Sequence, residues 1–216
     1  MERTIHHLIN IEVLTPETFV LHFERNGLQF TPGQYVVLRD PQSGDGREYS
    51  IYSSIHDDRL SFLIRRVKNG LFSRFLSHLR PGSAMYLEGP SGFFILDQAL
   101  KEGHPVLFIG TGTGISPFRS FVRSYPGLNY MVLHGVHFAD EGYGRTAYDP
   151  DRFCLCTSRE EKGDYFGRVT YYLKEYPPAR ETICYLCGNS NMIEDVTNLL
   201  EKYQIPPEHI RTEVFF

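Results

Sequence analysis

A glycine-rich segment in the middle of the chain has the composition of a phosphate-binding loop. The segment Gly110–Gly114 follows a predicted strand, Val106 to Ile109, and precedes a predicted helix over 116–123. Glycines allow backbone N–H groups to approach a phosphate, and the N-terminus of a helix adds its dipole. The segment lacks the Gly-Lys-Ser/Thr ending of a P-loop, and it is not a clean G-x-G-x-x-G motif. Taken alone, it is also explained as a tight strand-to-helix turn that requires small residues.

A second group of residues, in the first half of the chain, could bind a flat ligand that carries phosphate. Arg47 can clamp a phosphate, Tyr49 can stack on a ring, and Ser50 can form a hydrogen bond with a ring nitrogen. Downstream, the segment Gly70–Ser73 opens the one helix predicted in this half, so it offers free N–H groups and a hydroxyl to an anion. Without the Gly70–Ser73 segment, an ordinary exposed strand would explain Arg47, Tyr49 and Ser50.

The elements that must position the first group are predicted to be strands of an antiparallel β-barrel. Apolar and polar residues alternate over 9–13, 19–23 and 60–64, and a shorter strand is predicted around 85–87. This is the period of strands with one buried face, and Gly and Pro turns between short strands are typical of a barrel. Residues 71–79 follow the spacing of a helix instead, and Pro81-Gly82 is predicted to end it.

The elements of the second half are predicted to form an α/β domain with a parallel sheet. Apolar strands are predicted over 106–109, 130–133, 153–156 and 183–187, with helices over 116–123 and 193–203. Strands that alternate with helices indicate βαβ units, and ligands bind at the carboxyl ends of such strands. We therefore expect two domains, a β-barrel domain over 1–98 and a nucleotide-binding α/β domain over 99–216.

Composition excludes several classes of protein. The chain has 216 residues, of which 41% are hydrophobic and 22% charged, and a formal net charge of −4. These values are those of a globular protein, and the acidic balance argues against a nucleic-acid partner. No apolar stretch is long enough for a membrane-spanning helix, and the N-terminus lacks the apolar core of a signal peptide. The 4 cysteines are then expected to be reduced thiols in the cytoplasm.

Six short motifs, taken together, resemble those of the ferredoxin–NADP reductase family, and the resemblance covers nearly the whole chain. They are Arg47-x-Tyr49-Ser50, Gly70-x-x-Ser73, Gly110–Pro117, Ser158-Arg159-Glu160, Cys187-Gly188-x-x-x-Met192 and Glu213-Val214-Phe215. Their order and spacing are far more specific than any one of them. The chain is shorter than most members of the family, and it ends one residue beyond the aligned aromatic, at Phe216.

The resemblance implies that the barrel domain binds a flavin. FAD is expected, and the short chain leaves FMN open. Arg47 would bind the diphosphate with Gly70 and Ser73 behind it, Tyr49 would pack on the isoalloxazine, and Ser50 would lie near N5. Either Phe215 or Phe216 would cover the ring. Further flavin contacts are expected from Arg65 and Val67.

The resemblance also implies a site for NADP(H) in the second domain. Ser158 and Arg159 would bind the 2′-phosphate, although Glu160 is of the type that binds a free ribose. The catalytic residues would be Ser50, Cys187 and Glu213. Other contacts to the dinucleotide are expected from Gly110, Thr111, Gly112, Thr113, Gly114, Pro117, Tyr165, Arg168, Gly188 and Met192.

Three other patterns have alternative explanations. Cys184-x-x-Cys187 could indicate a dithiol, but both residues lie in a predicted strand rather than at a helix N-terminus. His134-x-x-His137 has the spacing of zinc ligands without a second pair, so no metal site is expected. The stretch 59–87 contains basic residues and no acidic one, which favours either a docking face for an acidic carrier or an ordinary solvated face. These basic residues are Arg59, Arg65, Arg66, Lys68, Arg74 and Arg80.

The function implied by the resemblance is that of a flavoprotein reductase. NADPH would deliver hydride to the flavin, and single electrons would pass to ferredoxin or flavodoxin, or the flow would be reversed. An alternative is an NAD(P)H-dependent reductase of free flavin, of a quinone or of an oxygenase iron–sulfur component. Another is a flavin-binding electron-transfer subunit without turnover of its own.

Overall fold

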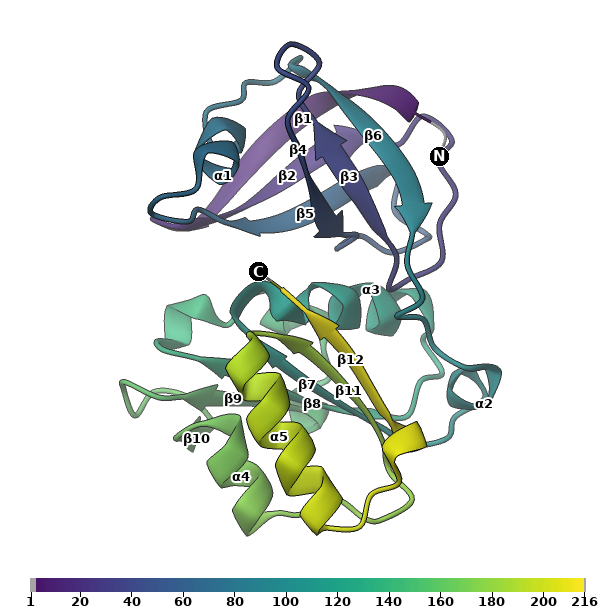
Figure 1. Ribbon diagram of the computed structural model, residues 1–216, viewed down its shortest axis with the longest axis vertical. Helices are drawn as coiled ribbons and strands as arrows, with labels where there is room; N and C mark the ends of the chain where they lie inside the picture. The colour runs from purple at the N-terminus through teal and green to yellow at the C-terminus, as the bar shows by residue number, and fades with distance from the viewer. Residues whose placement is uncertain (1–2, 216) are drawn as a thin grey trace. The chain divides into compact units, whose positions relative to one another are not determined.

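A computed structural model describes residues 3–215, and they divide into two compact units. The first unit comprises the chain up to Ile95 together with Arg119–Ser124, and the second comprises Leu96–Phe118 and the chain from Tyr125 onward. Figure 1 labels their helices and strands. The division therefore falls within one helix, whose second half belongs to the first unit. The expected domain boundary between residues 98 and 99 stays a prediction.

The first unit is a curled antiparallel sheet with the strand order β4-β3-β6-β1-β2-β5. Ile51 N donates to Gln34 O, just before β3, at 3.0 Å, and Tyr52 N donates to Ser61 O of β5 at 2.8 Å, so the chain that continues β4 is bonded to the strand at the opposite end of the order. These bonds close the sheet into the expected barrel around a core that includes Phe23, Leu38, Phe62 and Leu87. Its elements are β1 (Arg3–Thr15), β2 (Thr18–Glu24), β3 (Tyr35–Arg39), β4 (Gly46–Ser50), β5 (Arg59–Arg65), α1 (Leu71–Leu76) and β6 (Ala84–Ser91).

Helix α1 ends at Leu76, three residues before the predicted end. The carbonyl of Arg74, which would accept the next helical hydrogen bond, accepts from Ser77 Oγ at 2.8 Å and from His78 Nδ1 at 2.7 Å. The backbone N–H of His78 donates to Phe75 O instead, which is a tighter turn. Local bonds from side chains to the backbone thus compete with the helix at this point.

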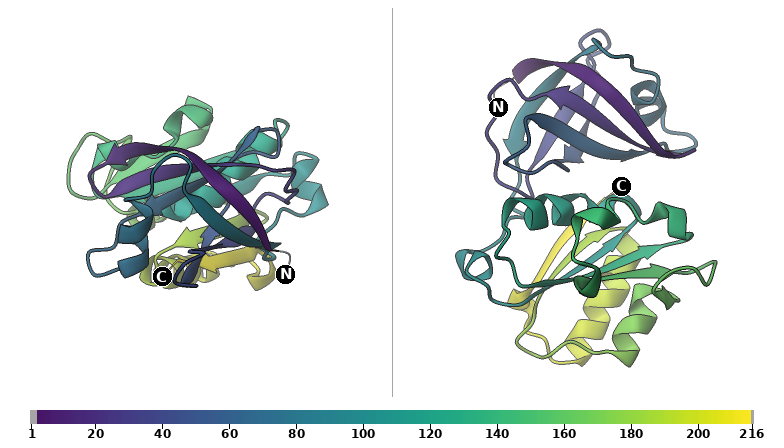
Figure 2. Two further views of the ribbon diagram at one scale, coloured as in Figure 1. Left: turned by 90° about the horizontal axis from the view of Figure 1, so that it is seen from above. Right: turned by 180° about the vertical axis from the view of Figure 1, so that it is seen from behind.

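The second unit is a parallel sheet with the strand order β10-β9-β8-β7-β11-β12, as expected for its class. Helices α4 and α5 cover one face, where Leu173 and Val196 pack against Leu107 and Leu186 (Figures 1 and 2). No helix within residues 3–215 is long and apolar enough to cross a membrane. The elements are α2 (Gln98–Lys101), β7 (Val106–Thr111), α3 (Ser116–Ser124), β8 (Tyr130–Val136), β9 (Phe153–Thr157), β10 (Tyr165–Phe166), α4 (Val169–Glu175), β11 (Ile183–Gly188), α5 (Ser190–Lys202) and β12 (Ile210–Val214), with 3-10 turns at Gly112–Ile115, Ala139–Glu141, Arg145–Ala147, Pro150–Arg152 and Pro207–His209.

Gly33 should be the least replaceable glycine of the first unit. Its φ is +92°, and a Cβ there would lie 1.9 Å from Phe94 O and 2.8 Å from the Phe121 ring. Gly33→Ala should lower the free energy of unfolding by at least about 2 kcal/mol, since backbone strain and overpacking add. Gly82, with a φ of +87° and no atom within 4 Å of such a Cβ, is the matched control. Urea unfolding measures both variants, and equal losses would contradict the steric argument.

Candidate functional site

Strand β4 presents Arg47 and Tyr49 on one face and Ser50 on the other, because side chains alternate along a strand. Arg47 is exposed, and its guanidinium donates to Gly46 O at 2.6 Å. The Tyr49 ring packs against the barrel core, and burial raises the pKa of Tyr49 to about 12. Tyr49 is therefore a neutral phenol at physiological pH and offers a fixed ring face. Ser50 is 7% exposed and pairs in register with Tyr35 of β3.

The turn before α1 is built on close contacts between Val67, Gly70 and Ser73. Ser73 Oγ accepts a hydrogen bond from Val67 N at 3.0 Å and donates to Gly70 O at 3.4 Å. A Cβ on Gly70 would lie 2.9 Å from both Ser73 Oγ and Val67 Cβ, so the turn requires glycine. Ser73 thus shapes the turn rather than presenting its hydroxyl outward. The start of α1 has no side-chain cap, and N–H groups that no side chain caps at a helix start can donate to an anion.

Exposed basic residues adjoin this turn. Arg65 forms an ion pair with Glu17 at 3.4 Å, and Arg66 Nη2 donates to Pro16 O at 3.0 Å. Arg74 Nη2 donates to Lys68 O at 3.4 Å. The fold therefore brings the carboxylate of Glu17 to a stretch that has no acidic residue in sequence. Arg65, Arg66, Lys68 and Arg74 together carry more charge than Glu17 offsets.

The carboxyl ends of β7 and β11, with the glycine-rich turn that follows β7, approach each other closely in the second unit. A Cβ on Gly114 would lie 2.3 Å from Cys187 O, and one on Gly188 would lie 2.5 Å from Thr111 Oγ1. Thr111 Oγ1 also accepts from Asn189 N at 3.2 Å. The glycines of these two motifs are therefore needed for packing between the loops. The same approach brings the glycine-rich segment and Cys187 to one edge of the sheet.

Cys187 and Glu213 form a pair at that edge. They are register partners on β11 and β12, and the Cys187 thiol donates to Glu213 Oε2 over 3.8 Å. Burial and the nearby carboxylate raise the pKa of Cys187 well above its ordinary value, so it is a neutral thiol. Phe215 N donates to Gly188 O at 2.9 Å, which ties the last described residue to the same edge. Phe216 lies outside the described residues.

The four cysteines are free and buried. Cys184 packs in the core with α5, and it lies three positions before Cys187 on a strand, so the two side chains point to opposite faces. Cys154 and Cys156 lie with their sulfurs 4.0 Å apart in the same core. A C-x-x-C redox pair is therefore not formed by Cys184 and Cys187. No group of three or more metal-ligating side chains is present among residues 3–215.

His134 has a role that its sequence pattern does not suggest. It lies beside Gly110 in the β7–β8 register, is fully buried, and donates from Nε2 to Gly112 O at 2.8 Å. Burial lowers the pKa of His134 to about 4, so the ring is neutral at pH 7. His134 therefore anchors the glycine-rich turn. No sequence pattern identifies this role, because the fold alone sets the register that brings His134 beside Gly110.

The segment after β9 is held by backbone bonds that leave the Arg159 side chain exposed. Ser158 donates from both N and Oγ to Val136 O, at 3.0 and 3.1 Å, and Arg159 N donates to His137 O at 3.0 Å. Glu160 accepts from Ala139 N and pairs with Lys162 at 3.3 Å. Glu160 thus has local partners, which removes the main argument that it binds a ribose.

The other expected dinucleotide residues lie before α4, in buried positions and in the glycine-rich turn. Tyr165 and Arg168 both precede α4; Arg168 is exposed, and Tyr165 Oη donates to Glu175, the last residue of α4, at 3.1 Å. Pro117 and Met192 are buried; Met192 packs in the core between sheet and helices. The structure therefore gives Met192 a packing role. Thr113 lies in the glycine-rich turn, where its carbonyl accepts from Ser116 Oγ at 2.7 Å.

Comparison with known proteins identifies the family. Residues 7–95 match the oxidoreductase FAD-binding domain. The chain is 30% identical to the electron transfer component of toluate 1,2-dioxygenase from Pseudomonas putida, over 95% of this chain and 66% of that protein. The chain belongs to the ferredoxin reductase family of FAD-binding oxidoreductases. The expected flavin is thus FAD, and the resemblance found in the sequence is confirmed.

Other members and solved structures agree with this assignment. The ferredoxin–NAD(P)+ reductase component of the naphthalene 1,2-dioxygenase system from Pseudomonas putida is 29% identical, over 87% of this chain and 61% of that protein. A ferredoxin NADP+ reductase from Neisseria gonorrhoeae superposes with a TM-score of 0.88 at 21% identity, with 100% of both chains covered. An Amycolatopsis cytochrome P450 reductase gives 0.86 at 26% identity, over 99% of this chain and 70% of that one. The chain spans about two thirds or less of the length of these two curated relatives.

Protonation of His134 should destabilise the protein as pH falls. The pKa of His134 in the folded protein, about 4, lies below the ordinary 6.5. Its contribution to the free energy of unfolding is therefore fully present above pH 6.5 and is lost as pH falls toward 4. The full loss is about 3 kcal/mol. Urea unfolding at pH 7 and pH 4.5 should show that the free energy of unfolding falls less for His134→Gln than for the wild type. His6 and His22 also have lowered pKa values, but they are present in both the wild type and His134→Gln, so their effect cancels in the comparison. Equal losses would contradict the assignment.

Proposed function

We propose that this chain is a flavoprotein reductase that oxidises NADPH and passes single electrons to an iron–sulfur protein. The observation that carries the proposal is the contact between the buried thiol of Cys187 and the half-buried carboxylate of Glu213 beside the glycine-rich turn, in a chain whose first unit matches an FAD-binding domain. A neutral thiol and a carboxylate at the carboxyl edge of a parallel sheet suit a pocket for a nicotinamide ring. The same pair would be of little use to a protein that only binds flavin.

The residues of the first unit would hold and orient the flavin. FAD supplies the chemistry that accepts a hydride and releases electrons one at a time. Arg47 and the uncapped N–H groups at the start of α1 would bind its diphosphate, and Tyr49 would support the ring system. Ser50, at the end of β4, would donate to a ring nitrogen. Arg65 and Val67 would line the same site, since they precede the Gly70 turn.

A preference for NADPH is supported by the segment after β9. Arg159 is exposed, Ser158 is adjacent, and Arg168 and Tyr165 follow at the neighbouring strand and helix. A 2′-phosphate needs cations of this kind, whereas a ribose hydroxyl is more often bound by an acid. Glu160, the acid of the Ser158-Arg159-Glu160 motif, is bonded to Ala139 and Lys162 instead. The Neisseria structure contains FAD and NADP.

The acceptor we favour is a ferredoxin-type iron–sulfur protein, either a separate carrier or a component of an oxygenase. The relatives from Pseudomonas putida are components of dioxygenase systems. The basic surface around Arg66, Lys68 and Arg74 suits an acidic partner, because complementary charge speeds association. A flavodoxin, a quinone or free flavin is a weaker candidate. A cytoplasmic location fits the free, buried cysteines.

The purified protein should be yellow and should release FAD on heating. Its visible absorbance should bleach when NADPH is added without air, and more slowly with NADH at equal concentration. Absorbance spectroscopy and identification of the released flavin measure both properties. A colourless protein that takes up neither FAD nor FMN would overturn the proposed function, and bleaching by NADH alone would overturn the choice of donor.

Arg159→Ala should lower kcat/KM for NADPH by about ten- to a hundredfold and leave kcat/KM for NADH almost unchanged. The loss reflects one hydrogen bond to a charged group, worth about 1.5–3 kcal/mol. It should appear mainly in KM, since the 2′-phosphate is remote from the reacting carbon. Lys162→Ala, which removes a cation already paired with Glu160, is the control and should have a smaller effect. Equal losses with both donors would mean that Arg159 is structural.

A further inference from the structure

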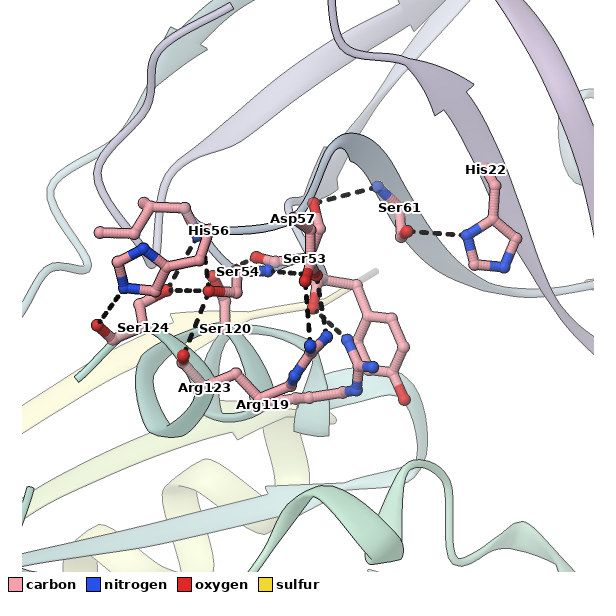
Figure 3. A network of polar contacts seen from close by, with 12 residues as sticks. His22, Ser53, Ser54, His56, Asp57, Ser61, Arg119, Ser120, Arg123 and Ser124 are labelled. Carbon is pink, nitrogen blue, oxygen red and sulfur yellow. Dashed lines mark hydrogen bonds and ion pairs between the residues drawn. The ribbon is translucent and has the colours of Figure 1, made fainter. Parts of the chain in front are cut away.

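The second half of helix α3 is part of the first unit, although the helix begins in the second. Figure 3 shows the polar network that holds it there. Arg123 forms a two-pronged ion pair with Asp57, at 2.8 and 2.9 Å. Ser124 Oγ accepts from Ile55 N at 3.1 Å, and Ser54 Oγ donates to Arg123 O at 3.2 Å. This end of the helix is therefore fixed to the chain just beyond β4.

The segment 51–54 follows Ser50 directly and lies outside any strand. The barrel holds it from one side, through the bonds from Ile51 N to Gln34 O and from Tyr52 N to Ser61 O. Ser53 Oγ also accepts from Ser61 N at 3.1 Å. Ser61 is itself bonded to His22 at 2.8 Å (Figure 3). These contacts involve the N–H groups and one side chain of the segment.

Helix α3 holds the carbonyl groups of the same segment from the other side. Arg119 Nη1 donates to Tyr52 O at 2.8 Å, and its guanidinium lies 4.1 Å from the centre of the Tyr52 ring. Ser120 Oγ donates to Ser53 O at 2.7 Å. Tyr52 is 4% exposed, and Ser53 and Ser120 are fully buried. Removing either donor would leave a buried carbonyl without that bond, so the main chain would shift to regain one.

We propose that Arg119 and Ser120 are positioning residues of the flavin site. They fix the main chain at Tyr52 and Ser53, two and three residues after Ser50, and so set where the Ser50 hydroxyl lies against the flavin ring. The inference rests on the proposed function for the role of Ser50. Misplacement of a reacting group by about 1 Å can cost on the order of a hundredfold in rate. A smaller shift at Ser50 should therefore be measurable.

The test compares Ser120→Ala with Ser120→Thr, which keeps a hydroxyl, and with Arg119→Lys, which keeps the charge but not the planar group over Tyr52. Arg123→Gln is the matched control, because it weakens the same helix anchor without removing either donor to the 52–53 carbonyls. Each protein is purified with its flavin. The visible spectrum, the flavin midpoint potential, the flavin reduction rate at saturating NADPH, the affinity for NADP+ and the melting temperature are measured.

Ser120→Ala should change the flavin spectrum and midpoint potential and slow flavin reduction by about tenfold or more. Its affinity for NADP+ should be unchanged, Ser120→Thr should resemble the wild type, and Arg123→Gln should lower only the melting temperature. If Ser120→Ala does not fold, Arg119→Lys decides by the same readouts. Wild-type spectra and rates in Ser120→Ala and Arg119→Lys would overturn the inference, as would equal changes in Arg123→Gln. A wild-type protein without flavin would instead contradict the proposed function.

Discussion

The site in the second unit depends on one steric constraint, the direct contact of the chain at the carboxyl ends of β7 and β11. Gly114 lies against the Cys187 carbonyl and Gly188 lies against Thr111, at distances that admit no Cβ. With that contact made, Cys187 lies beside the glycine-rich turn, and the β11–β12 register then brings in Glu213. His134 completes the arrangement from β8 by fixing Gly112. A thiol, a carboxylate and a glycine-rich turn are thus assembled by main-chain packing.

The first unit achieves its site differently, through side chains that stabilise irregular main chain. The turn at Val67–Gly70 is shaped by a serine hydroxyl, and the segment after Ser50 is held by barrel carbonyls that accept from its N–H groups and by side-chain donors from α3. Both segments lie where a regular strand has just ended. Irregular backbone exposes polar groups that a ligand can use, and buried side-chain donors keep it in one conformation.

Regular elements and compact motifs could be predicted from the sequence, because their signals are local. Alternation revealed the barrel strands, and the glycine motif was correctly placed between a strand and a helix. Helix α4 was missed because only seven residues, rich in Tyr and β-branched side chains, form it, and the two-residue edge strand β10 carries no period at all. The bonds from Arg119 and Ser120 join residues 67 positions apart, and His134 acts through one carbonyl. Such contacts leave no periodic trace in the sequence.

The burial of every cysteine has a practical consequence. Thiolate reagents need an accessible sulfur, and none of the four native thiols offers one in the folded state. A single cysteine introduced at an exposed position, such as Lys68 on the basic surface, would be the one site open to maleimide chemistry. The protein could then be attached to an electrode or a fluorophore in a chosen orientation without first removing Cys187 from its pair with Glu213.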